Sequence, residues 1–294
     1  MLLPGWLAKN LTPCINPLRL NHYLQQPLHF CLLIPCYNDK AGLVQALQSV
    51  DYPFKHCLAV VVDDGSTQPL VAGNIQEKVG TGLQVLVIRL SQNKGITAAL
   101  NTGLDWIVAN TTAPYIARLD CADKCHPQRF YQQVAFLNNH PQVGLLGTWC
   151  QFATEDKSLV YNYITPVAHE AIKKEMHRRN VFIHPTVMFR TALVAAGERY
   201  PYSFPHAEDY GFFWRLLQLT EGAVLAQYLV TCAIIRSGLS SRNRWKQLQS
   251  RKRVVQAFGQ KGWITWQGLA KLNLLMLVPK AVLLRLKGLT NKHS

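Results

Sequence analysis

The 294-residue sequence lacks several patterns that would decide its function class at once. It contains no phosphate loop of the Gly-x-x-x-x-Gly-Lys type and no Gly-x-Gly-x-x-Gly fingerprint, which excludes the common nucleotide-binding loops. Its eight cysteines do not have the clustered spacing of a zinc site or a small disulfide scaffold, so we expect buried, reduced thiols. No uninterrupted apolar run reaches the roughly 18 residues that a membrane-spanning helix needs. Pro4, Gly5, Lys9 and Pro13 interrupt the apolar N-terminus, so we do not expect a signal peptide.

Acidic residues are absent from the last quarter of the chain. After Glu221, the remaining 73 residues contain 13 Lys and Arg and no Asp or Glu, so this segment carries most of the net charge of +15. Such a block suits an anionic surface, either phospholipid headgroups or nucleic acid. Since no finger, aromatic recognition motif or helix-turn-helix signature is present, an anionic membrane surface is the favoured partner and nucleic acid the less favoured one.

The basic segment also has a helical pattern. Asn273, Lys280 and Lys287 fall seven residues apart, so a helix places them on one side with Leu and Met elsewhere. This arrangement is typical of a helix lying in a membrane interface, and Pro279 predicts a kink or a break within it. We therefore expect residues 241–294 to be helical and to associate with a membrane.

The first 150 residues alternate between short apolar, β-branched runs and helical stretches. We expect strands at residues 29–35, 57–62, 84–90, 115–119 and 143–152, with helices at 41–50, 69–79, 95–109 and 127–139. Later residues predict helices at 167–179 and 209–219 and strands at 186–189 and 224–235. Apolar strands separated by helices indicate an α/β fold whose mostly parallel sheet is covered on both faces. The expected division is a lead segment 1–28, a main domain 29–240 and the basic region 241–294.

Polar and acidic side chains follow four of the expected strands. Asparagine, aspartate or lysine stands at each of these ends, at Asn38, Asp63 and Asp64, Asn93 and Lys94, and Asp120 and Asp123. One such end is explained by a turn or a helix cap, but four together favour a ligand site, because ligands bind beyond the carboxyl ends of strands in open α/β sheets. Carboxylates there hold a divalent cation that neutralises a diphosphate, or accept hydrogen bonds from a base or ribose.

Several of these segments stand in the order of a known family. They read IPCYN, VVDDGST, NKGITAALNTGL and YIARLDCADKC between Ile34 and Trp149, then HPTVMFR at 184–190 and AEDYGFFWRLL at 207–217. The set resembles the family 2 glycosyltransferases with the GT-A (Rossmann-like) fold, most of all those that build bacterial surface polysaccharides. The likeness covers roughly residues 29 to 220. It implies transfer of a sugar from a nucleotide-diphosphate donor, of the UDP or dTDP type, to a hydroxyl acceptor that is lipid-linked or a saccharide.

The resemblance also implies roles for single residues. The acids of DDGS, Asp63 and Asp64, would bind the base and ribose, and Asp120 would bind the metal and the donor diphosphate. The second acid of the Glu208-Asp209 pair would be the catalytic base, although the pair also reads as a helix N-cap. The complete set of nucleotide-sugar-binding candidates is Pro35, Tyr37, Asn38, Asp63, Asp64, Asn93, Lys94, Gly95, Arg118 and Asp120.

The sequence departs from the family pattern at the metal motif. Where the family has a further aspartate, Ala122 stands between Cys121 and Asp123. Three alternatives follow: Asp123 joins Asp120 as a ligand of Mn²⁺ or Mg²⁺, the metal binds weakly and Lys94 or Arg118 supplies positive charge, or activity is lost and the chain is a scaffold subunit.

The remaining motifs bear on the type of transfer. One base without a covalent intermediate implies inversion at the anomeric carbon. Processive relatives carry Gln-x-x-Arg-Trp, whereas this chain has Ser241 in place of the glutamine before Arg244 and Trp245. This difference favours the transfer of a single sugar, and we expect a cytoplasmic enzyme peripheral to the inner face of the cell membrane.

Overall fold

The computed structural model describes residues 27–278 apart from 54–55, 81–82, 155, 157, 159, 235–243 and 261. The chain forms two compact units, one from Met1–Pro141 with Val187–Arg199 and the other from Gln142–Thr186 with Tyr200–Ser294. The expected boundaries at residues 28 and 240 follow a different division and stay a prediction. Of that division, residues 1–26 and 235–243 lie outside the described part.

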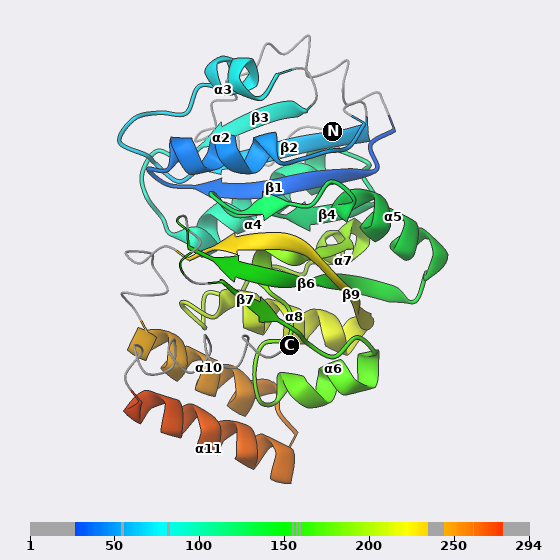
Figure 1. Ribbon diagram of the computed structural model, residues 1–294, viewed down its shortest axis with the longest axis vertical. Coiled ribbons are helices and arrows are strands. Elements are labelled where there is room, and N and C mark those ends of the chain that lie inside the picture. The colour runs from blue at the N-terminus through cyan, green and yellow to red at the C-terminus, as the bar shows by residue number, and fades with distance from the viewer. Residues whose placement is uncertain are drawn as a thin grey trace. The chain divides into compact units, whose positions relative to one another are not determined.

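The first unit contains a mostly parallel sheet (Figure 1). Its strands run in the order β3-β2-β1-β4-β8, with bounds β1 Phe30–Cys36, β2 Cys57–Asp63, β3 Gln84–Arg89, β4 Tyr115–Arg118 and β8 Met188–Arg190. The first four pair in parallel, and β8 is antiparallel to β4. Cys36 lies opposite Asp63, and Asp63 opposite Arg89, so the carboxyl ends of β1, β2 and β3 align at one edge. The predicted α/β fold is confirmed.

Helices follow the strands of this unit. They are α2 Lys40–Gln48, α3 Ala72–Val79, α4 Ile96–Asn110, α5 Arg129–Asn139 and α7 Thr191–Ala195, and the two-residue strand β5 is Lys124–Cys125. Figure 1 shows α2 and α4 on opposite sides of the sheet, and α4 packs on β1 and β2. A Cβ at Gly103 would lie 2.2 Å from Leu33 Cδ1, so a larger residue there would force the Leu33 side chain to move. The helix expected from residue 69 begins at Ala72, because the Leu70 amide donates to Asp63 instead.

The second unit is built on a three-strand arrangement. Strand β6, Val143–Ala153, pairs in parallel with β9, Glu221–Ala233, and antiparallel with β7, Val160–Tyr163, which was not predicted. The accompanying helices are α6 His169–Met176 and α8 Glu208–Leu219, with a 3₁₀ turn at His184–Thr186. The helix expected over 167–179 ends at Met176, so the chain leaves the helix before Asn180.

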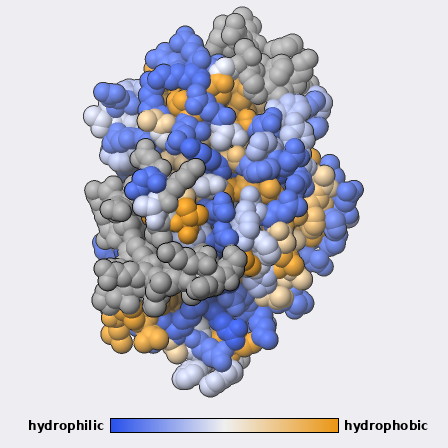
Figure 2. Space-filling view, viewed as in Figure 1, coloured by the Kyte–Doolittle hydropathy of each residue, from blue (hydrophilic) through white to orange (hydrophobic). Residues whose placement is uncertain are grey.

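Two further helices complete the described part of the second unit. They are α10 Arg244–Phe258 and α11 Trp263–Leu277, which contact each other and carry no acidic residue. The outer side of α11 exposes Trp263, Trp266, Leu274 and Leu277, and Figure 2 shows hydrophobic side chains at the surface where α11 ends. Among the described residues, no helix combines the length and hydropathy needed to cross a membrane. Pro279, Lys280 and Lys287 of the predicted interface helix lie outside the described residues.

Candidate active site

Asp63 ends β2 and is completely buried. Its Oδ1 accepts from the Ser66 amide at 2.9 Å, and its Oδ2 accepts from the Leu70 amide at 3.1 Å and from Arg89 Nη1 at 2.6 Å. Arg89 also donates to the Ser66 carbonyl at 2.9 Å. Asp63 therefore fixes the loop after β2 to the end of β3, and its predicted contact with the nucleotide stays a prediction.

Asp64 connects the same loop to the start of α4. Its two carboxylate oxygens accept from the backbone amides of Lys94 at 2.7 Å and Gly95 at 2.9 Å. Burial raises the pKa of Asp64, and these two hydrogen bonds oppose that rise. Gly65 follows with φ of 69°, and a Cβ there would lie 2.3 Å from the Gln92 carbonyl carbon, so only glycine permits this approach. The structure thus brings together three predicted site residues, Asp64, Lys94 and Gly95.

The loop after β1 meets the loop after β2. The Asn38 amide donates to Ser66 Oγ at 2.9 Å, and Asn38 Oδ1 accepts from the Thr67 amide at 2.8 Å. Asn38 has a positive φ of 53°, a conformation that asparagine tolerates better than most residues. The side chain of Tyr37 is exposed, and so are Asn93 and Lys94 on the loop after β3. These exposed groups at aligned strand ends are available to a ligand.

Asp120 follows β4 and forms an ion pair with the buried side chain of Arg118. Arg118 is completely buried and donates from Nη2 to Asp120 Oδ1 at 2.6 Å, while its Nη1 bonds to the carbonyls of Leu33 and Leu119. The Arg118 carbonyl in turn accepts from Arg129 Nη2 at 2.8 Å. The side chain of Asp120 is 36% exposed. Arg118 therefore orients the Asp120 carboxylate from the protein interior. Its predicted contact with the donor stays a prediction.

The loop from Asp120 to Asp123 determines how well a divalent metal would fit. Ala122 has a left-handed φ of 67° and its amide donates to the Gly42 carbonyl at 2.9 Å, whereas Asp123 is 6% exposed. No group of three or more His, Cys, Asp or Glu residues that would hold a metal occurs in the described parts of the chain. Mg²⁺ commonly takes only one or two protein carboxylates besides substrate phosphates. Asp120, with a side chain that is 36% exposed, is a carboxylate that fits such a site.

Glu208 and Asp209 belong to the second unit. They occupy the first turn of α8, whose N-cap is Ala207 without a side-chain cap bond, so the alternative of a plain N-cap is not what the structure shows. Glu208 is buried, and Asp209 is partly exposed. Asp209 Oδ2 accepts from Asn180 Nδ2 at 3.0 Å.

Three residues that bond to Asp63 or Asp209 were not predicted as site residues. Arg89 and Ser66 bond to the predicted loops, and Asn180 bonds to Asp209. Ser66 lies within the VVDDGST segment, so its neighbourhood was a usable signal. No sequence pattern pointed to Asn180, because it lies 29 positions from Asp209 in the chain.

Comparisons with known proteins identify the family of this chain. The family model described as glycosyl transferase family 2 matches residues 31–202, more than half of the chain. The chain belongs to glycosyl transferase family 2. The predicted assignment as a glycosyltransferase is therefore confirmed. This family 2 enzyme is 26% identical to the amylovoran biosynthesis glycosyltransferase AmsE of Erwinia amylovora, over 80% of this chain and 88% of that one.

Other relatives support the family and the fold. An uncharacterized glycosyltransferase of Haemophilus influenzae is 30% identical over 63% of this family 2 chain and 67% of its own length. The crystal structure of S. aureus TarS 1–349 in complex with UDP-GlcNAc has a TM-score of 0.62 at 19% identity, over 83% of this chain and 71% of that one. The mannosyltransferase PcManGT from Pyrobaculum calidifontis, in complex with GDP-Man and Mn²⁺, has a TM-score of 0.58 at 15% identity, covering 91% and 84%. These structures show the GT-A fold.

Proposed function

We propose that this family 2 glycosyltransferase moves a single sugar from a nucleotide-diphosphate sugar to a hydroxyl acceptor, with inversion, in the synthesis of a surface polysaccharide or glycolipid. The observation that carries the proposal is Asp120, a partly exposed carboxylate held by a buried arginine at the carboxyl edge of a parallel sheet. The relation to the amylovoran enzyme supports a surface polysaccharide.

The donor's nucleotide would bind at the aligned strand ends of the first unit. Asp64 holds the amides of Lys94 and Gly95, and Asp63 holds the loop that bonds to Asn38, so the floor of this site is organised before any ligand binds. Tyr37 presents an exposed ring for the base, and the ammonium of Lys94 would attract the diphosphate. The UDP-GlcNAc complex of TarS and the GDP-Man complex of PcManGT support a nucleotide-sugar donor here.

Asp120 would hold Mn²⁺ or Mg²⁺ together with the donor phosphates, with Asp123 as the weaker candidate because it is buried. When bound, the cation would neutralise charge that develops on the leaving diphosphate. Arg118 keeps the Asp120 carboxylate in one orientation, since its guanidinium is fixed by two backbone carbonyls. The Mn²⁺ complex of PcManGT supports the use of a divalent cation.

Asp209 would remove the proton from the acceptor hydroxyl. It is partly exposed, as a base that meets a substrate must be, and it stands in the first turn of a helix, where the helix dipole stabilises its negative charge. Direct attack by the activated hydroxyl on the anomeric carbon breaks the bond to the diphosphate in one displacement and inverts the configuration. Ser241, the sequence feature that favours a single transfer, lies outside the described residues.

We also propose that α11 lies on an anionic phospholipid surface at the inner face of the cell membrane. Trp263 and Trp266 stack with ring centroids 4.8 Å apart and are 67% and 59% exposed. With Leu274 and Leu277 they fall at helical spacing on one face, and tryptophan is enriched at membrane interfaces. Helices α10 and α11 carry basic residues and no acid, which complements anionic headgroups.

The membrane proposal is tested by co-sedimentation with vesicles of phosphatidylglycerol and phosphatidylcholine. Replacing Trp263 and Trp266 together by serine should reduce binding at least about tenfold, because both rings leave the interface. Tyr202→Ser, which removes a ring that is 67% exposed outside α11, is the matched control. Undiminished binding of the double variant would overturn the assignment of α11.

The transferase proposal is tested by screening UDP-, dTDP- and GDP-sugars for binding and for release of the nucleoside diphosphate, with and without Mn²⁺ or Mg²⁺. Asp209→Asn should lose about 10²- to 10⁴-fold in turnover while nucleotide binding persists. An unimpaired variant would remove the base assignment. The scaffold alternative, motivated by Ala122, would be supported if no donor is bound or cleaved. The nucleic-acid alternative predicts strong, salt-sensitive binding to DNA or RNA.

A further inference from the structure

We propose that Asn180 is a positioning residue for Asp209, holding the carboxylate in the orientation and the ionised state that proton abstraction requires. The inference rests on the proposed role of Asp209 as the base. It arises from one contact, the donation from Asn180 Nδ2 to Asp209 Oδ2 at 3.0 Å. A hydrogen bond donated to a carboxylate favours its charged form and fixes the direction of its remaining lone pairs.

The orientation of the Asn180 amide is determined by its second contact. Asn180 Oδ1 accepts from the Phe182 backbone amide at 3.3 Å. A backbone amide only donates, so the amide oxygen must face Phe182 and the NH₂ group must face Asp209. The reversed amide would lose both bonds and would direct its oxygen at a carboxylate. The donor role of Asn180 therefore follows from the local backbone.

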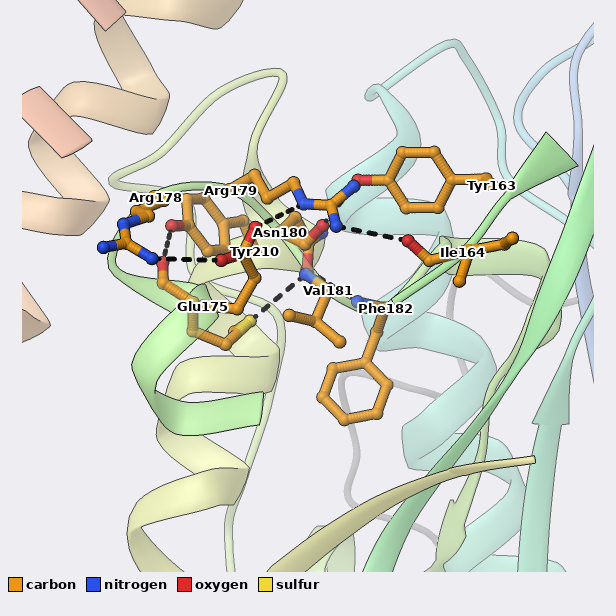
Figure 3. Close-up of polar contacts among 10 residues, drawn as sticks. Tyr163, Ile164, Glu175, Arg178, Arg179, Asn180, Val181, Phe182 and Tyr210 are labelled. Atoms are coloured by element: carbon orange, nitrogen blue, oxygen red, sulfur yellow. Dashed lines mark hydrogen bonds and ion pairs between the residues drawn. The ribbon is translucent and has the colours of Figure 1, made fainter. Parts of the chain in front are cut away.

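The backbone of Asn180 is fixed from several sides, as Figure 3 shows. Tyr163 of β7 donates its hydroxyl to the Asn180 carbonyl at 2.9 Å. The Val181 amide donates to Met176 Sδ at 3.4 Å, and Tyr210, next to Asp209 on α8, donates its hydroxyl to the Met176 carbonyl. Both partners of the Asn180–Asp209 bond are thus tied to the end of α6, and the bond has little freedom to open.

The two arginines before Asn180 stabilise the same segment. Arg179 donates to Glu175 Oε1 at 2.6 Å and to the Ile164 carbonyl at 3.2 Å, and its guanidinium lies 5.0 Å from the centre of the Tyr163 ring. Arg178 lies 3.7 Å from Glu175 Oε2 and donates to Gln267 of α11 at 2.6 Å. Both arginines therefore have acceptors of their own, and the amide of Asn180 donates to Asp209.

A neutral donor suits a base better than an arginine would. A guanidinium bonded to the carboxylate would hold the charge strongly and weaken its affinity for a proton, whereas an amide orients it at a lower cost in basicity. The charged and titratable groups on the elements around the first turn of α8 include Glu208 and Tyr210 on α8, Glu175 on α6, His177, Arg178 and Arg179 before Asn180, Tyr163 on β7, Arg251 on α10 and Lys271 on α11. Burial raises the pKa of Tyr210 and of Tyr163, so both stay neutral donors.

The experiment compares Asn180→Ala and Asn180→Asp with the full chain, using nucleotide release from UDP-N-acetylglucosamine or from the best donor of the panel. We expect kcat to fall about 10- to 100-fold in both, with little change in UDP affinity. The acidic limb of the pH–rate profile should move to higher pH in Asn180→Ala. It should move further in Asn180→Asp, because two adjacent carboxylates disfavour ionisation of both. A purely structural role for Asn180 would leave the profile in place.

Two further variants separate the possible outcomes. Asn162→Asp changes an asparagine of β7 that bonds to Gln151 and not to Asp209, so it should keep the normal profile. Tyr163→Phe removes the hydroxyl that bonds to the Asn180 carbonyl and interacts with Arg179. It should shift the profile slightly in the same direction, even if Asn180→Ala fails to fold. An inactive Asp209→Asn with normal profiles for Asn180→Asp and Tyr163→Phe would overturn this inference alone. An active Asp209→Asn would instead remove the proposed base.

Discussion

Strands β2 and β4 lie on either side of β1; Asp63 ends β2, Asp120 follows β4, and each pairs with an arginine at 2.6 Å. The two ion pairs differ in which partner is buried. Asp63 is 0% exposed and Arg89 reaches it from a side chain that is 27% exposed, whereas Arg118 is 0% exposed and Asp120 is 36% exposed. A buried acid bonded on both oxygens organises the fold, while an exposed acid on a buried cation is held ready for a ligand. The two acids look alike in sequence, but their expected roles differ according to whether the acid or the arginine of the ion pair is buried.

The largest expected effect is that of Asp63→Asn on stability. The substitution leaves Arg89 without its carboxylate and directs an NH₂ group at donors, so we expect a loss of about 3–5 kcal/mol in the free energy of unfolding. Urea unfolding measures it. The matched control is Asp105→Asn, whose ion pair with Arg199 at 2.7 Å is partly exposed on both sides and should contribute under about 1 kcal/mol. Equal losses in the two variants would show that the burial of Asp63 does not distinguish it.

Asp120→Asn should show the opposite pattern. Arg118 keeps the carbonyls of Leu33 and Leu119 as acceptors, and the asparagine oxygen can still accept from its Nη2, so we expect a smaller loss in the free energy of unfolding than in Asp63→Asn. Turnover should fall about 10²- to 10³-fold. Nucleotide release and urea unfolding, measured on the same preparation, separate the two effects. A variant that unfolds early yet keeps full turnover would place Asp120 with Asp63 as a structural acid.

A smaller effect is expected from restoring the second acid of the metal motif. Ala122 is left-handed at φ 67°, a conformation that aspartate tolerates better than alanine, so Ala122→Asp should fold normally. With a second carboxylate beside Asp120, the affinity for Mn²⁺ in the presence of UDP should rise about tenfold, measured by calorimetry. Ala122→Gly is the control, since it relieves the backbone without adding a ligand. If both variants bind Mn²⁺ equally, the carboxylate at 122 is not a ligand.

Much of the first unit follows from its sequence. Apolar runs such as CLAVVV predict a buried parallel strand, and the acids and glycine directly after it predict a loop at the carboxyl edge. The family motifs then identified Asp64, Lys94 and Gly95, which the structure brings into direct contact. These relations are visible in sequence because they join the ends of strands that follow one another along the chain.

The second unit was less predictable for physical reasons. Strand β7, Val160–Tyr163, has no apolar alternation because its side chains are only partly buried, and α6 ends early, at Met176. The Asn180–Asp209 bond joins a loop to a helix, and no periodicity records which distant side chain an amide will meet. The burial that separates Asp63 from Asp120 is likewise set by neighbouring strands and not by the acid's own segment.

The smallest effect, and the finest test of the comparison, is expected from Arg89→Lys. Lysine keeps the positive charge near Asp63 but has a single nitrogen, so it can bond to Asp63 Oδ2 while losing the donation to the Ser66 carbonyl. We expect a loss of about 1 kcal/mol by urea unfolding, the usual net contribution of one hydrogen bond, with turnover nearly unchanged. If the loss instead approached that of Asp63→Asn, the two-point grip of the guanidinium, and not the charge, would be what holds Asp63 in place. In that case the partly exposed arginine would organise the loop as much as the buried acid does.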